Sequence, residues 1–143
     1  MANVAEKLNP YLSDLVVFYL KLHDLHWNVK GKMFIQVHLY TEARYEDMAS
    51  KFDEVAEMII MNQGAPVTGM KAYLDGASIK ELNKGSYRDE EVLQILIEDM
   101  SSLKETALKL CDECEECFPV VNMLQVHIES YNKELWFSLN HFI

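Results

Sequence analysis

The sequence has 143 residues, half of them apolar, with a formal net charge of −10 and a pI near 4.9. This length fits a single domain, residues 1–143, built around one core. The negative charge repels phosphate backbones and anionic lipid, so direct nucleic-acid binding and membrane-surface binding are disfavoured. The longest apolar run, at residues 15–20, is too short to span a bilayer, and residues 1–10 lack a signal-peptide pattern. We therefore expect a soluble, cytoplasmic protein.

Apolar residues at helical spacing predict two long helices in the first half of the chain. The first covers about residues 4–28 and is followed by a breaker, Gly31. The second covers about residues 33–63 and stops before Gly64 and Pro66. Because the connection between them is short, the two helices are expected to pack as an antiparallel hairpin.

The second half of the chain predicts another hairpin, reached through a long crossover at residues 64–88. The segment AYLDGASIKEL, at 72–82, keeps enough apolar residues for a short helix within this crossover. A third helix starts at Asp89, and its apolar stripe continues into Cys114 and Cys117. The fourth covers about residues 120–141, with Trp136 and Phe142 on its inner or contact face. The fold class is therefore all-α, a ferritin-like four-helix bundle with a short helix in its one long connection.

Five side chains on the first hairpin have the spacing of metal ligands. On the second helix His38 and Glu42 are four residues apart, as are Asp53 and Glu57, so each pair projects from one face. His26 and His38 flank the turn at comparable heights, about 8 and 11 Å from it at a rise of roughly 1.5 Å per residue. We expect His26, His38 and Glu42 to converge.

The other two carboxylates are too far along the helix to join them within one subunit. Asp53 lies about 22 Å beyond His38 along the helix axis. A two-fold axis that packs this helix against its own copy would instead bring Asp53 and Glu57 of one subunit opposite the other three residues of its partner. Two imidazoles and three carboxylates suit ferrous iron, with zinc as a competitor.

Several stretches of the chain resemble one known family. HWNVKG at 26–31, F-x-x-x-H-x-x-x-E-x-x-Y at 34–45 and D-x-x-x-E at 53–57 look like the ferroxidase signature of the Dps mini-ferritins, the DNA-binding proteins from starved cells. The similarity extends to AYLDGASIKE at 72–81 and NMLQVHIESYNKELW at 122–136. It therefore spans nearly the whole chain.

The resemblance implies a homo-dodecameric shell that oxidises ferrous iron, preferentially with hydrogen peroxide, and stores the ferric mineral inside, protecting against oxidative stress. It implies a metal site at the dimer interface, with Trp27 beside the iron to intercept stray oxidising equivalents. The larger ferritins carry an E-x-x-H element within each subunit, which this sequence lacks. The implied ligands are His26, His38 and Glu42 of one subunit with Asp53 and Glu57 of its partner.

Other residues have simpler interpretations. His23, His127 and His141 are expected to be satisfied core or surface residues, and Trp27 has packing as its alternative role. Glu42, Asp53 and Glu57 could each belong to a solvated helix face, although together with the signature they favour the metal site.

The cysteines and the acidic residues around them leave two questions open. The three cysteines are expected to be reduced, and Cys114 and Cys117 to pack as small apolar groups. The alternative is soft-metal binding or oxidation by Cys111, Cys114 and Cys117 together. In the family this corner lines acidic pores for iron entry, and the chain offers four carboxylates there: Asp112, Glu113, Glu115 and Glu116.

Two other functions remain as alternatives at this point. One is a nucleoid-binding DNA-protection protein, which the acidic charge and the missing basic tails argue against. The other is a non-catalytic metal-binding shell or antigen, in which the metal has a structural role.

Overall fold

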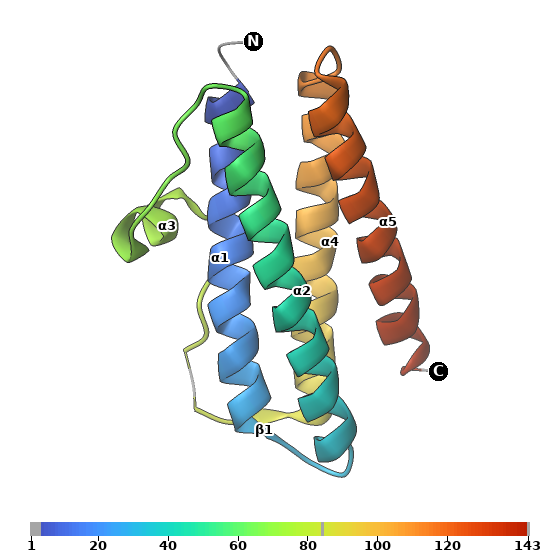
Figure 1. The fold of residues 1–143 in the computed structure, drawn as a ribbon. Helices are drawn as coiled ribbons and strands as arrows, with labels where there is room; N and C mark the ends of the chain where they lie inside the picture. The colour runs from blue at the N-terminus through green and yellow to red at the C-terminus, as the bar shows by residue number, and fades with distance from the viewer. Residues whose placement is uncertain (1–3, 84, 143) are drawn as a thin grey trace.

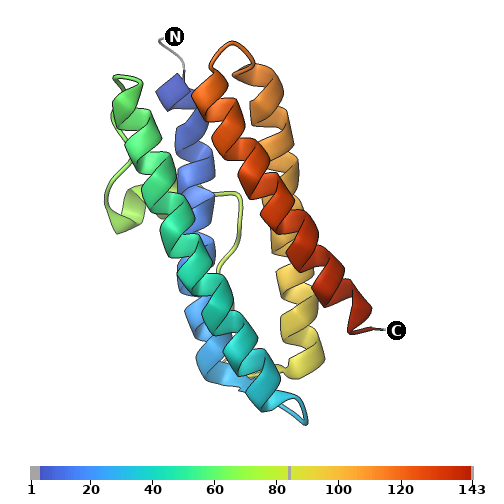
Figure 2. The ribbon, with the colours of Figure 1, turned by 45° about the vertical axis from the view of Figure 1, so that its right-hand side comes forward.

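The computed structural model describes residues 4–83 and 85–142. The elements of this part of the chain are α1 (Val4–Asn28), β1 (Val29–Lys30), α2 (Phe34–Met61), α3 (Met70–Gly76), β2 (Tyr87–Arg88), α4 (Asp89–Glu113) and α5 (Phe118–Asn140). The hairpins α1–α2 and α4–α5 pack side by side as a four-helix bundle, and α3 lies outside it beside α1 (Figures 1 and 2). The predicted ferritin-like bundle with one long connection is confirmed.

How much of each helix is buried depends on how many other elements pack against it. In α4 a single stripe is buried, at steps of three and four residues, including Leu96, Met100, Leu103 and Ala107. In α1 every residue from Tyr11 to Phe18 is buried, because α2, α4 and the crossover cover it from different sides. Helix α1 is therefore the central element, and the polar groups on this stretch are shielded from water.

The short crossover helix forms earlier than the sequence predicts. It covers Met70–Gly76 rather than the segment at 72–82, and the chain is extended from Ala77. The carboxylate of Asp14 on α1 accepts hydrogen bonds from the backbone N–H groups of Ser78 (2.6 Å) and Ile79 (2.9 Å) and from the Ser78 hydroxyl (2.9 Å). These bonds replace the helical ones that residues 78 and 79 would otherwise make.

A two-residue parallel ladder that the sequence does not predict joins the two hairpins. Val29 of β1 pairs with Tyr87 of β2, and Lys30 pairs with Arg88. Val29 and Tyr87 are buried, so the ladder closes the lower end of the core. It fixes the start of α4 against the turn that follows α1.

The aromatic residues at the end of the fourth helix take the second of the two expected positions, an outer face that is open to contact. Trp136 is 62% exposed and Phe142 is also exposed, so within one subunit neither lies on an inner face. Helix α5 begins at Phe118, with Pro119 in its first turn, where the missing N–H of proline costs no hydrogen bond. A search of the described residues finds no helix with the length and apolar character that crossing a bilayer requires.

Candidate metal centre

His26, near the end of α1, and His38, in the second turn of α2, meet ring to ring beside the Gly31 turn. Their ring centroids are 3.6 Å apart and their planes 15° from parallel. The hydrogen bonds are reciprocal: Nδ1 of His26 donates to the backbone carbonyl of His38 (2.6 Å), and Nδ1 of His38 donates to the carbonyl of His26 (2.8 Å). The hairpin therefore orients both imidazoles through its own backbone.

This arrangement fixes the tautomer of each ring. A carbonyl oxygen only accepts hydrogen bonds, so each Nδ1 carries a proton and each neutral ring keeps the Nε2 lone pair available. Metal-binding histidines are commonly held in this way, with one nitrogen anchored to a carbonyl and the other free to bind. Thr41 completes the anchor: its Oγ1 lies 3.1 Å from Nδ1 of His26 and 2.9 Å from the His38 carbonyl.

Glu42 supplies an oxygen beside these nitrogens. Its Oε1 lies 3.9 Å from Nε2 of His26, while the side chain of Glu42 is 45% exposed and that of His26 is buried. His26 therefore lies beside both His38 and Glu42, with the two imidazoles held by the backbone and the carboxylate half exposed to solvent. Nitrogen and oxygen donors of this kind suit ferrous iron, and zinc as well.

Asp53 and Glu57 stand apart from this group. Both are exposed on α2, which runs without a break from Phe34 to Met61. The estimate of about 22 Å between Asp53 and His38 along the helix axis therefore applies. Among the described residues no group of three or more His, Cys, Asp or Glu side chains is arranged to hold a metal ion. One subunit thus presents two incomplete sets of donors at different heights on α2.

Aromatic side chains border the histidines. Trp27 is 68% exposed, with its ring centroid 5.5 Å from that of His23. His23 stacks on Tyr45 at 3.8 Å, and Tyr45 meets His26 edge-on at 5.3 Å. His23 is thus part of the packing around the candidate site, while the indole of Trp27 faces outward.

Thr41 was not among the site residues expected from the sequence. Its position three residues after His38 was the available signal, because a threonine there can bond back to the carbonyl that His26 also uses.

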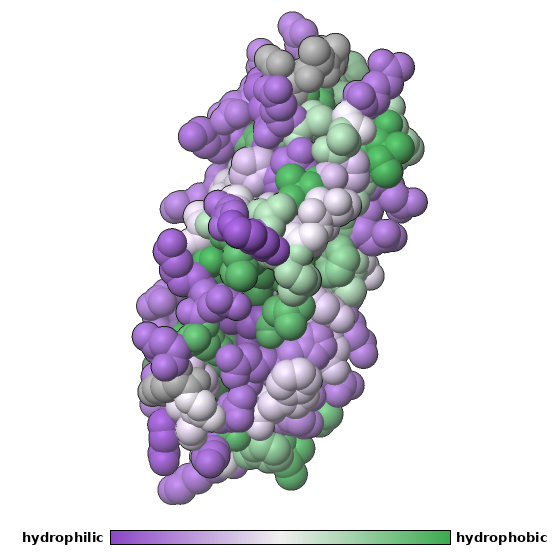
Figure 3. Space-filling model, turned by 90° about the vertical axis from the view of Figure 1, so that its left-hand side faces the viewer, coloured by the Kyte–Doolittle hydropathy of each residue, from purple (hydrophilic) through white to green (hydrophobic). Residues whose placement is uncertain are grey.

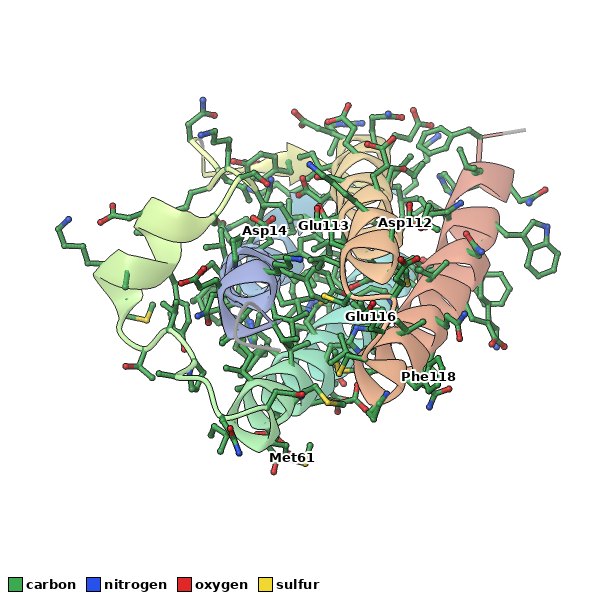
Figure 4. All side chains as sticks on the ribbon, turned by 90° about the horizontal axis from the view of Figure 1, so that it is seen from above. Asp14, Met61, Asp112, Glu113, Glu116 and Phe118 are labelled. Carbon is green, nitrogen blue, oxygen red and sulfur yellow. The ribbon has the colours of Figure 1, made fainter. Side chains whose placement is uncertain are left out.

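The cysteines at the opposite end of the bundle favour packing over metal binding. Cys114 is buried, and burial raises the pKa of the thiols of Cys111 and Cys114, which keeps them protonated. The thiol of Cys117 donates to Oδ1 of Asn62 at 3.5 Å. Around this corner Figure 4 shows Asp112 and Glu113 beside the end of α4 and Glu116 in the connection to α5, and all three are exposed.

Known proteins resemble this chain in sequence and in fold. A ferritin-like domain model matches residues 5–142. The DNA protection during starvation protein of Helicobacter pylori is 32% identical over 78% of this chain and 77% of its own. General stress protein 20U of Bacillus subtilis is 32% identical over 89% of this chain and 90% of its own.

A solved structure extends the similarity to three dimensions. The DPS protein of Vibrio cholerae O1, described as a member of a broad superfamily of ferritin-like diiron-carboxylate proteins, has a TM-score of 0.94 and 27% identity. The match covers 99% of this chain and 90% of that protein. Fold and sequence agree: this chain belongs to the ferritin-like family and is a mini-ferritin of the Dps type, a class whose general role is iron storage and protection.

Proposed function

We propose that this protein oxidises ferrous iron, preferentially with hydrogen peroxide, at ferroxidase centres shared between subunits, and stores the ferric product inside a shell of twelve chains in the cytoplasm. In each centre His26, His38 and Glu42 of one subunit would bind iron together with Asp53 and Glu57 of its partner. Trp27, exposed beside His23, would lie next to the iron and intercept stray oxidising equivalents.

The observation that carries the proposal is the reciprocal anchoring of His26 and His38. Both Nδ1 atoms are held by backbone carbonyls, so both Nε2 atoms are free for a metal in the resting protein. Core packing alone does not require two stacked imidazoles with the same free nitrogen, and Glu42 stands 3.9 Å from one of them. The remaining ligands have to come from outside the subunit, because Asp53 and Glu57 sit too far along α2.

The chemistry is a two-electron reduction of peroxide by two ferrous ions. Each ferrous ion gives up one electron, and peroxide takes two electrons and two protons to become two water molecules. The carboxylates offset the additional positive charge of the ferric product, which hard oxygen donors also prefer. The reaction removes ferrous iron and peroxide together, the two components from which hydroxyl radical forms.

Mixed shells test the shared centre. An Asp53→Ala, Glu57→Ala double variant and a His26→Ala, His38→Ala double variant should each lose peroxide-dependent iron oxidation. In a dimer that contains one chain of each kind, one of the two centres takes all its ligands from undamaged halves. Random pairing of equal amounts should therefore restore about a quarter of the wild-type centres, measured as the rate of ferric absorbance and of peroxide consumption.

The control is a Glu98→Ala, Glu105→Ala double variant, which removes the same charge from exposed positions on α4 and should keep full activity. Light scattering must first give about twelve times the 16.6 kDa subunit mass for every shell, and mass spectrometry must show mixing. If mixed shells regain no activity, the centre does not lie between subunits. If wild-type shells bind iron but consume no peroxide, the metal-binding shell without catalysis is the correct function.

A further inference from the structure

A chain of hydrogen bonds in the core connects three helices away from the histidine pair. The hydroxyl of Tyr11 on α1 lies 2.6 Å from the hydroxyl of Tyr131 and 2.9 Å from Nδ1 of His127, both on α5. Nε2 of His127 lies 2.7 Å from Oε1 of Glu54 on α2. Tyr11, Tyr131 and His127 are almost completely buried, whereas the side chain of Glu54 is 54% exposed.

The exposed end sets the direction of every bond in this chain. A carboxylate oxygen accepts hydrogen bonds, so Nε2 of His127 donates to Oε1 of Glu54. Burial lowers the pKa of His127, which keeps the ring neutral and leaves its Nδ1 as an acceptor. Tyr11 therefore donates to His127, and Tyr131 donates to Tyr11. Burial also raises the pKa of both phenols, so both stay protonated at rest.

This chain of hydrogen bonds reaches the surface at Glu54, next to the candidate ligands Asp53 and Glu57. Glu54 directly follows Asp53 and precedes Glu57 by three residues, within roughly 4.5 Å along the axis of α2. Only His127 therefore separates the buried hydroxyl of Tyr11 from the segment of α2 that would face the partner's iron.

We propose that Tyr11 is a redox-active residue, with His127 as the base that receives its proton and Tyr131 as a hydrogen-bond donor to its oxygen. The inference rests on the proposed iron oxidation. Its oxidant is hydroxyl radical, formed when peroxide meets one ferrous ion instead of two. A carboxylate, a histidine and a hydroxyl in one hydrogen-bonded line form the arrangement that lets a histidine take a proton at the moment of reaction.

The electrons and protons of the step balance. Tyr11 loses one electron, which reduces hydroxyl radical to hydroxide, and the phenolic proton moves to Nδ1 of His127. The products are a neutral tyrosyl radical and an imidazolium paired with the Glu54 carboxylate. A further ferrous ion then returns one electron and becomes ferric, and the proton returns from His127 to Tyr11. One misdirected oxidising equivalent thereby oxidises iron instead of damaging the shell.

The surroundings favour oxidation of Tyr11 over oxidation of Tyr131. The ammonium of Lys51 lies 5.3 Å from the ring centroid of Tyr131, and a cation over a ring opposes removal of an electron from it. Tyr131 also donates to another phenol rather than to a base. Tyr40 provides the contrast within this bundle: its hydroxyl meets Glu134 (2.8 Å) and Ser138 (3.2 Å), and neither partner is an imidazole.

Freeze-quench electron paramagnetic resonance on the assembled shell tests the proposal. Wild-type shells given ferrous iron and a small excess of peroxide should show a tyrosyl signal that narrows when the tyrosine rings are deuterated. The signal should carry a coupling to an exchangeable hydrogen and to nitrogen-15 introduced into histidine. It should be lost in Tyr11→Phe and persist in the matched variant Tyr40→Phe, and spin-trapped hydroxyl radical should rise only in Tyr11→Phe.

An unchanged tyrosyl signal in Tyr11→Phe overturns the proposal, as does a wild-type signal without the histidine coupling. The second result needs no variant, so it decides the matter even if Tyr11→Phe fails to assemble. Ferric absorbance recorded on the same samples separates this inference from the proposed function. If no iron is oxidised, the proposed function fails, and azidyl radicals from pulse radiolysis still report whether Tyr11 can be oxidised.

Discussion

Asp14 and His26 lie on the same helix, and the different partners they find explain their different roles. His26 meets a carbonyl and keeps one nitrogen free, so it can act on something outside the chain. Asp14 is buried, and its carboxylate accepts hydrogen bonds from the backbone N–H groups of residues 78 and 79 and from the Ser78 hydroxyl. A buried carboxylate with three donors is a structural element of the crossover.

We expect Asp14→Ala to lower the free energy of unfolding by about 1–3 kcal/mol, because it leaves buried N–H groups of the crossover without partners. Urea unfolding of the assembled protein, followed by circular dichroism, measures the loss. Asp75→Ala is the control: Asp75 pairs with Lys71 at the surface, where an ion pair contributes little. Equal midpoints for the two variants would show that Asp14 does not hold the crossover.

Whether the sequence predicts that two residues lie close together depends on how far apart they are along the chain. His26, His38 and Glu42 lie on one hairpin, so helix geometry and a local motif were enough to place them together. Tyr11 and His127 are 116 residues apart, and no local pattern links them. His127 was expected to be a satisfied core or surface residue, and the structure shows its hydrogen-bond partners, Tyr11 and Glu54.

At the scale of elements, long periodic segments were predictable and short ones were not. The four bundle helices begin and end within a few residues of the expected positions, since each repeats its apolar spacing over many turns. Helix α3 and the β1–β2 ladder are set by tertiary partners instead. The helix α3 ends at Gly76 because Asp14 accepts hydrogen bonds from the residues that follow. A strand of two residues is too short to show an alternation of apolar and polar residues in the sequence.

The turn between α1 and α2 depends on glycine. Gly31 has a φ of +132°, which other residues rarely adopt, and a Cβ there would clash with the carboxylate of Asp89. That carboxylate accepts the backbone N–H of Met33 at 2.8 Å, which lowers its pKa. The turn therefore ties the start of α2 to the start of α4.

Gly31→Ala should destabilise the protein by more than about 1 kcal/mol, because the substitution is incompatible with both the backbone conformation and the space. Thermal unfolding measures the effect. Gly85→Ala serves as the control, since no atom lies within 4 Å of a Cβ at that exposed position. A melting temperature for Gly31→Ala equal to that of Gly85→Ala would contradict this account of the turn.

At the scale of the whole molecule, the subunit exposes more apolar surface than its bundle requires. Trp136, Phe137 and Leu139 stand out from α5. A groove of about 410 Å³ lies between α1 and the crossover, lined by residues such as Leu20 and Leu74, and Figure 3 shows apolar side chains among hydrophilic ones on the left-hand side of the Figure 1 view. Apolar surfaces of this kind mark contacts with other chains, in keeping with the proposed shell.

The charge of that shell leads to a prediction about nucleic acid. Twelve copies carry about −120 formal charges, which repel a polyanion. We expect no retardation of duplex DNA in a gel shift at neutral pH and physiological salt. A variant with a lysine-rich N-terminal extension should retard the DNA and serves as the positive control. A shift by the unextended, metal-free shell would mean that charge does not control this interaction, and that protection involves contact with DNA.

The small ladder between β1 and β2 also bears on the order in which the subunit folds. It joins Val29 to Tyr87, so its formation closes a loop of roughly sixty residues, at an entropic cost of roughly 4 kcal/mol plus a constant. Each hairpin has mainly local contacts and can collapse quickly by itself. We expect the docking of the two hairpins in the correct register to be the slowest step, so that a newly made chain would complete the surfaces it offers to other subunits of the proposed shell only after this docking.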